Sequence, residues 1–72
     1  MSGLRSVTVD VRDMLCAQAL AVVAQAAGRL PAGEALEIMY NAEDVKQDLI
    51  AWAQQRGRAI QDAGPMRLRL VV

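Results

Sequence analysis

The stretch VDVRDMLCAQALAVVAQAAGRL, from Val9 to Leu30, passes from one residue pattern into another. Around its start, over Val7–Val11, apolar residues occupy every second position, which predicts a half-buried β-strand. From Cys16 to Ala27 the chain is rich in Ala, the best helix former, and Gly28 is a natural stop for a helix. A strand followed by a helix therefore opens the fold, and Cys16 lies where the two patterns meet.

The same order repeats in the middle of the chain. Residues alternate again over Leu36–Tyr40, which predicts a second strand. Asn41 is a good helix cap, and Asp44 three residues later returns the bond or complements the helix dipole. Gly57 is expected to end this helix. Apolar residues at helical spacing give it one buried face, made of Val45, Leu49, Trp52 and Ala53.

The last part of the chain predicts two short strands joined by a turn. The strands cover Ala59–Ala63 and Met66–Val72, and the turn contains Ala63–Pro65. The resulting order, β-α-β-α-β-β over residues 1–72 without a linker, predicts a single α+β domain. We expect a two-layer α/β sandwich with a four-stranded mixed sheet and both helices on one face. Residues predicted on the open face are Thr8, Asp10, Glu37, Arg67 and Arg69, with the arginines pairing across strands with the acids.

Composition excludes several classes of function. Lys plus Arg and Asp plus Glu each number 8, and this zero net charge argues against nonspecific nucleic-acid binding. The chain has no His and one Cys, so it offers neither an internal disulfide nor a good metal site, and no cofactor is expected. Met1–Ser6 does not open a signal peptide, and no run of about 18 apolar residues predicts a membrane span. We expect a cytoplasmic protein without membrane contact.

The position of Cys16 allows two interpretations. In a β-α-β-α chain with parallel strands, both helix N-termini emerge at one sheet edge, and a helix N-terminus favours a thiolate. Arg12 adds a second positive charge upstream, so we expect a lowered thiol pKa and a nucleophilic Cys16. The alternative is that Cys16 is a small apolar residue that packs against the core.

Four strings, DVRDMLC, AGEALEI, DLIAW and RGRAI, resemble the TusA/SirA family of small sulfur-carrier proteins over nearly the whole chain from Val7. The resemblance implies the same β-α-β-α-β-β sandwich. It also implies that Cys16 carries sulfur as a persulfide. The implied partners are a sulfur-donor protein, either a cysteine desulfurase or rhodanese-like, and a sulfur-acceptor protein.

The departures from the family pattern gather around the cysteine. Asp13 replaces a Gly, Ala17 and Ala19 replace the two prolines of Cys-Pro-x-Pro, Asn41 replaces an Asp, and Arg58 replaces a His. Ala retains the backbone of a first helical turn, so the helix is expected to survive. Asp13 either raises the thiol pKa through its charge or caps the helix, and it is also a candidate partner contact.

Other candidate partner contacts are Met14, Leu15, Tyr40 and Asp48. Met14 and Leu15, if exposed, form an apolar docking lip beside the thiol. Tyr40 either packs in the core or lines the sheet edge near Cys16. Asp48 matches a family position, although the helix dipole alone also favours an acid there.

A basic patch is a further possibility. Arg56 and Arg58 could join Arg12 to meet an acidic donor surface, or they are solvated helix-end arginines.

Three hypotheses of function follow. The first is a sulfur carrier or sulfurtransferase acting through Cys16. The second is a TusA-like binding or regulatory module with reduced transfer, favoured by the loss of both prolines. The third is a structural subunit that pairs through its open sheet face.

Overall fold

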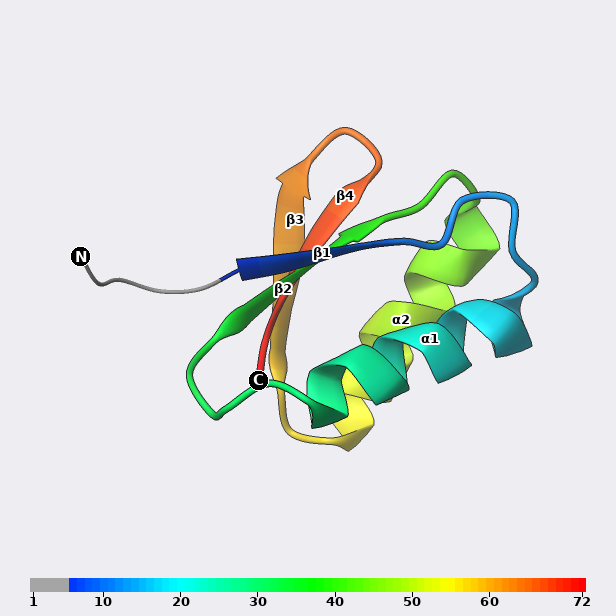
Figure 1. Cartoon of the computed structure of the whole chain (residues 1–72). Coiled ribbons are helices and arrows are strands. Elements are labelled where there is room, and N and C mark those ends of the chain that lie inside the picture. The colour runs from blue at the N-terminus through cyan, green and yellow to red at the C-terminus, as the bar shows by residue number, and fades with distance from the viewer. Residues whose placement is uncertain (1–5) are drawn as a thin grey trace.

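The computed structural model describes residues 6–72 and consists of a four-stranded sheet with two helices on one of its faces (Figure 1). In chain order its elements are β1 (Ser6–Asp10), α1 (Cys16–Gly28), β2 (Ala35–Met39), α2 (Glu43–Gln55), β3 (Ala59–Gly64) and β4 (Arg67–Val71). The predicted α+β sandwich with the order β-α-β-α-β-β is confirmed. The expectation about a signal peptide falls mainly on residues 1–5, outside the described residues.

The strands lie in the order β1-β2-β4-β3. β1 and β2 are parallel, as expected for strands joined through a helix, and β4 is antiparallel to both β2 and β3. β3 is therefore parallel to β2 but separated from it by β4. This arrangement brings the C-terminal ends of β1 and β2, and with them the starts of α1 and α2, to the same edge of the sheet.

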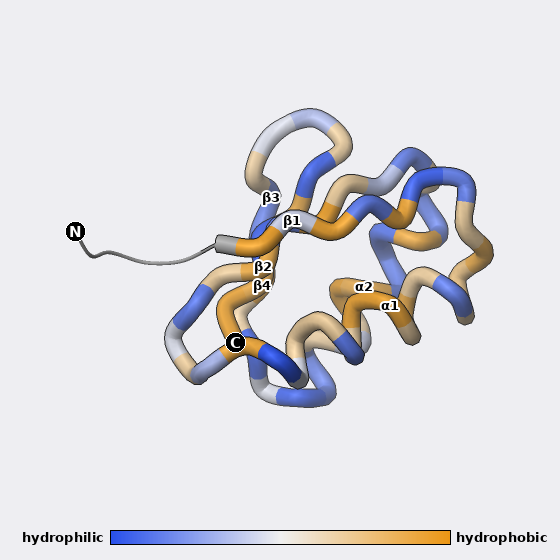
Figure 2. Tube along the Cα trace, viewed as in Figure 1, coloured by the Kyte–Doolittle hydropathy of each residue, from blue (hydrophilic) through white to orange (hydrophobic). Residues whose placement is uncertain are grey.

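Apolar side chains fill the space between the sheet and the helices. Figure 2 colours the apolar residues of these elements orange along the chain trace. Every second residue of β2 and β4 points into this layer, where Leu36, Ile38, Leu68 and Leu70 are no more than 1% exposed. The helices contribute small side chains, including Ala19 and Ala53, which are fully buried. The core contains no phenylalanine because the chain has none, and α1 in particular is rich in Ala.

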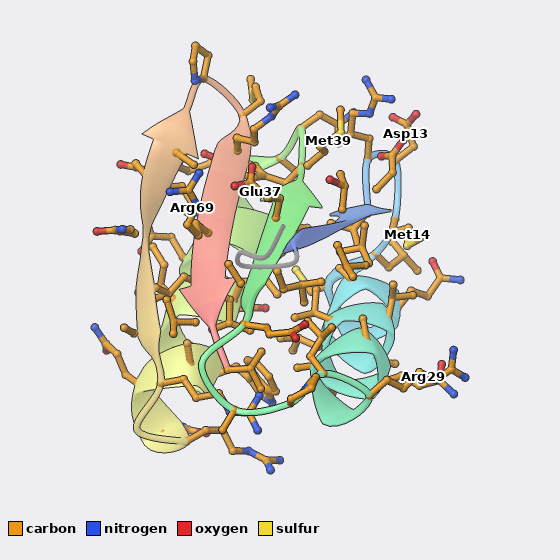
Figure 3. The ribbon with its side chains drawn as sticks, turned by 60° about the vertical axis from the view of Figure 1, so that its left-hand side comes forward. Asp13, Met14, Arg29, Glu37, Met39 and Arg69 are labelled. Carbon is orange, nitrogen blue, oxygen red and sulfur yellow. The ribbon has the colours of Figure 1, made fainter. Side chains whose placement is uncertain are left out.

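The open face of the sheet carries the predicted polar set. Register places Thr8, Glu37 and Arg69 in one row across β1, β2 and β4. Arg69 Nη2 lies 2.7 Å from Glu37 Oε2, and Figure 3 shows the two side chains on this face. The expectation that Arg67 also pairs with an acid across the strands is wrong, because its neighbour on β2 is Met39.

Of the two ends of α2, only the C-terminal one is as the sequence predicts. At its C-terminus the prediction for Gly57 is confirmed: Gly57 has φ +70°, and the backbone N–H groups of Gly57 and Arg58 donate to Gln54 and Ala53. This is a Schellman motif, for which glycine is the favoured residue. At the N-terminus the cap is Ala42 rather than the predicted Asn41, and no side chain caps the helix.

The two helices are short. Each spans 13 residues, and α1 ends at Gly28 with Arg29 as its C-cap, so the predicted stop at Gly28 is confirmed. In the part of the chain that the structure describes, neither helix is long and apolar enough to cross a membrane.

Candidate functional site

Two loops converge at the edge of the sheet where α1 and α2 begin. The loop after β1 is tied to β2 by the backbone N–H of Val11, which donates to the carbonyl of Met39 at 2.9 Å. Further along, Asp13 donates its backbone N–H to Asn41 Oδ1 at 3.0 Å, and Asn41 Nδ2 donates to Asp13 Oδ1 at 2.8 Å. These contacts fix the approach of the chain to Cys16.

Asp13 therefore neither caps α1 nor is among the groups that raise the pKa of Cys16, the two roles expected from the sequence. Its carboxylate bonds to Asn41, and the cap of α1 is Leu15. The backbone of Asp13 has φ +63°, a region where Gly is at ease and Asp is among the better-tolerated residues.

Cys16 is the first residue of α1, is partly exposed, and packs against the edge of the hydrophobic core. No side chain caps the N–H groups of this first turn, although Gln18 Oε1 accepts from the backbone N–H of Leu15 at 3.2 Å. Unpaired N–H groups at a helix start favour a nearby anion. The thiol thus combines partial burial with access to solvent and a helix N-terminus behind it.

Two carboxylates of α2 oppose this effect. Hydrogen bonding to Asp48, followed by desolvation and the negative charges of Asp44 and Asp48, raises the pKa of Cys16 to about 11. The expectation of a lowered pKa is wrong for this structure, because it considered the helix terminus without these two acids. The sequence predicts Asp44 only as a helix-start residue, yet its i,i+4 spacing from Asp48 puts both carboxylates on one helix face.

Arg12 lies in an ion pair with Asp10. Its Nε and Nη2 atoms donate to the two carboxylate oxygens at 2.9 and 2.8 Å, and this pairing holds the pKa of Asp10 at about 2. Arg12 is not among the groups that shift the pKa of Cys16. Its role as a stabiliser of the thiolate stays a prediction.

The apolar candidates beside the thiol differ in exposure. Leu15 is 75% exposed, whereas Met14 is half-buried and packs against the core. Figure 3 shows Met14 near the start of α1, apart from Glu37 and Arg69. Tyr40 is 6% exposed and belongs to the hydrophobic core, as the packing alternative expected. The lip beside Cys16 therefore consists mainly of Leu15.

The arginines that follow α2 are remote from Cys16. Arg56 and Arg58 both lie over the ring of Trp52, at 5.6 and 5.8 Å from its centroid. Arg56 follows Asp44 by twelve residues, about 18 Å along a helix axis. The basic patch joining them to Arg12 is not formed. Arg58, the residue in place of the family His, packs at the far end of the helix layer.

The acids near Cys16 are not arranged as a metal site. Among the described residues, no group of three or more Cys, Asp or Glu side chains is placed to hold a metal ion. What the site offers is one thiol, a helix N-terminus, two carboxylates and an exposed Leu. Such a set suits chemistry at sulfur itself.

No curated protein and no solved structure matches the chain. A family model described as Sulfurtransferase TusA matches residues 7–70. The match includes both loops of the site, Cys16 and all four strands in whole or in part. The chain belongs to the TusA family.

Proposed function

We propose that this protein is a cytoplasmic sulfur carrier that accepts sulfane sulfur as a persulfide on Cys16 and relays it to an acceptor protein. The observation that carries the proposal is the position of Cys16. It is the first residue of α1, partly exposed, in a chain whose residues 7–70 match a sulfurtransferase family. A donor of the cysteine desulfurase or rhodanese-like class would supply the sulfur.

The proposed transfer is redox-neutral. The Cys16 thiolate attacks the terminal sulfur of the donor persulfide, a bond forms between Cys16 Sγ and that sulfur, and the donor S–S bond breaks. The donor cysteine leaves as a thiolate and takes up a proton. In the second half, an acceptor thiolate attacks the terminal sulfur on Cys16 and releases the Cys16 thiolate. Neither half requires a cofactor.

The thiol must ionise for the first half to occur. With its pKa raised to about 11, Cys16 is mostly protonated at pH 7. The free protein is therefore a slow nucleophile. This property favours a carrier that reacts mainly when held by a donor, and it limits reaction with unrelated electrophiles.

A second candidate function is a TusA-like binding or regulatory module that transfers little sulfur. The raised pKa of Cys16 and the Ala residues at positions 17 and 19 favour it. This candidate predicts that partner binding persists unchanged when Cys16 is replaced by Ser. The carrier proposal instead predicts that the same replacement abolishes sulfur transfer.

A radiolabel test distinguishes the two. The full chain is incubated with a cysteine desulfurase and [35S]cysteine, desalted, and then mixed with an excess of an acceptor thiol. The carrier proposal predicts label on the protein, none on the Cys16→Ser variant, and release of the label by the thiol. An unlabelled protein, also with polysulfide or with thiosulfate plus rhodanese as donor, would reject the carrier function and favour the binding module.

A further inference from the structure

The charges around Cys16 do not balance. Three ion pairs occur among the described residues, and they use Asp10, Glu37 and Asp62 as acids. Four acids at the starts of the two helices have no cation within ion-pair distance in that part of the chain: Asp13, Glu43, Asp44 and Asp48. Two of these bond to neutral amides, Asp13 to Asn41 and Glu43 to Gln47. The end of the molecule that bears the thiol is therefore acidic.

Within residues 6–72, the nearby cations are paired with other acids, and several others lie away from these acids. Arg12 is paired with Asp10, and Lys46 lies 3.5 Å from Asp62. Arg56 and Arg58 lie over Trp52 at the other end of α2. Arg67 points from the open face of the sheet, away from the helix layer.

Leu15 adds an exposed apolar side chain to the same surface. It occupies the N-cap of α1 with φ −71° and ψ 157°, a position where Ser, Thr, Asp or Asn would cap the free N–H groups. Leu makes no such bond, and its side chain is 75% exposed. The exposed Leu15 side chain, next to Cys16, is therefore accessible to a partner protein.

We propose that the surface formed by Leu15, Cys16, Asp44 and Asp48, here named the thiol rim, docks a basic protein surface. Its partner presents an apolar contact to Leu15 and Lys or Arg side chains to the two carboxylates, and docking activates the thiol. This inference rests on the proposed function and specifies the chemistry of the partner. It replaces the sequence-based expectation of an acidic donor surface meeting arginines of this chain.

Activation follows from electrostatics. Asp44 and Asp48 disfavour the thiolate in the free protein because their negative charges repel it. A cation brought to these carboxylates compensates their charge, so the thiol releases its proton to solvent more readily. By reciprocity, the partner binds the thiolate form more tightly than the thiol form. Docking and ionisation therefore promote each other.

Small disulfides of opposite charge test the electrostatic part without knowledge of the natural partner. The full chain is mixed at low ionic strength with cystamine, which is cationic, or with 3,3′-dithiodipropionate, which is anionic. In each case the Cys16 thiolate attacks one sulfur, a mixed disulfide forms and the other half leaves as a thiolate. Intact mass against time gives the two rates. The cystamine rate is divided by the rate of the anionic disulfide, and this ratio is divided by the same ratio for a free cysteine peptide. The corrected ratio is expected to be about ten.

Salt and matched variants check the cause. In about 1 M salt, where the screening length is about 3 Å, the corrected ratio should approach one. Replacing both acids, Asp44→Asn with Asp48→Asn, should also bring it close to one. Glu37→Gln makes a comparable charge change on the open face and should leave the ratio unchanged. An anionic reagent that reacts as fast as cystamine, or a preference that survives the double replacement, would overturn the proposal.

The apolar part is tested with a peptide. A Lys- and Leu-containing peptide with a 2-pyridyl disulfide on its cysteine should react several-fold more slowly with Leu15→Ser than with the natural chain, after each peptide rate is divided by the cystamine rate of the same protein. An equal peptide rate would remove Leu15 from the docking surface. Polysulfide loading on the same samples separates the two proposals. If polysulfide adds sulfur to Cys16 but cystamine and the anionic disulfide react equally fast, only the basic partner is rejected. If cystamine reacts faster but polysulfide adds no sulfur to Cys16, only the sulfur-carrier function is rejected.

Discussion

Asp13 and Asn41, 28 residues apart, exchange two hydrogen bonds that join the loop before α1 to the loop before α2. Asn41 serves as acceptor for the backbone N–H of Asp13 and as donor to its carboxylate. Each loop leads directly into a helix of the site. The pair therefore holds Cys16 in place relative to the acids of α2.

Asn41→Ala removes both bonds and should lower the free energy of unfolding by about 1–2 kcal/mol, the net worth of two hydrogen bonds, one of them to a charged group. Denaturant unfolding followed by circular dichroism measures the change. Gln47→Ala is the matched control, since it removes one exposed bond within α2 and should cost less than about 0.5 kcal/mol. Equal stability of Asn41→Ala and the natural chain would show that the pair does not hold the loops.

The conformation of Asp13 gives a second test. Its φ of +63° is costly for a residue with a Cβ and free for Gly. Both Asp13→Gly and Asp13→Ala lose the carboxylate and keep the N–H bond to Asn41, so they differ mainly in backbone strain. Asp13→Ala should be less stable than Asp13→Gly by about 1 kcal/mol. Thermal unfolding compares them, and the reverse order would mean that the loop rearranges.

Asp48→Asn should lower the pKa of Cys16 from about 11 toward its ordinary value, because it removes the charge of the residue that contributes most to the shift. The rate of alkylation by iodoacetamide should then rise at pH 8, and its pH profile should shift to lower pH. Glu43→Gln is the control, since Glu43 on the same helix is not among the groups that shift Cys16. A profile that moves equally in both variants would contradict a specific contact with Asp48.

Leu15→Ser should stabilise the fold and impair docking at once. Ser supplies the missing N-cap of α1, so the free energy of unfolding should rise by about 0.5–1 kcal/mol. Thermal unfolding measures the gain. Lower stability would mean that Leu15 packs against the fold in spite of its exposure. A gain in stability with slower peptide reaction is the pattern of a residue kept for binding.

The two missing family prolines should differ in effect when restored. The backbone N–H of Ala17 has no partner within the helix, so Ala17→Pro should change stability by less than about 1 kcal/mol. Ala19 donates its N–H to the carbonyl of Leu15 at 2.9 Å and its side chain is fully buried. Ala19→Pro removes this bond and should cost about 1–3 kcal/mol. Denaturant unfolding of both variants gives the comparison.

Much of the fold can be predicted from local sequence patterns. Alternation over Val7–Val11 and Leu36–Tyr40 predicts β1 and β2 to within one residue at each end. Gly57 predicts the end of α2, because the Schellman motif depends on residues close in sequence. The position of β4 between β2 and β3 depends on pairing across the whole chain, which local pattern does not contain.

The site is harder to predict from the sequence, because its main contacts join residues that are far apart in the chain. Local rules assign Asn41 to a helix cap and Asp13 to a charge or a cap, and the structure pairs them with each other instead. The same limitation gave the wrong sign for the Cys16 pKa. The helix N-terminus is a local feature, whereas Asp44 and Asp48 reach the thiol through the packing of α2 beside α1.

The central claim is that Cys16 carries sulfane sulfur, and intact mass spectrometry tests it most directly. The full chain and Cys16→Ser are incubated with a cysteine desulfurase and cysteine, then with polysulfide as an independent donor. We expect a gain of about 32 Da, one sulfur atom, on the natural chain alone, and its loss on treatment with a thiol reductant. No gain with either donor, or an equal gain on Cys16→Ser, would contradict the account.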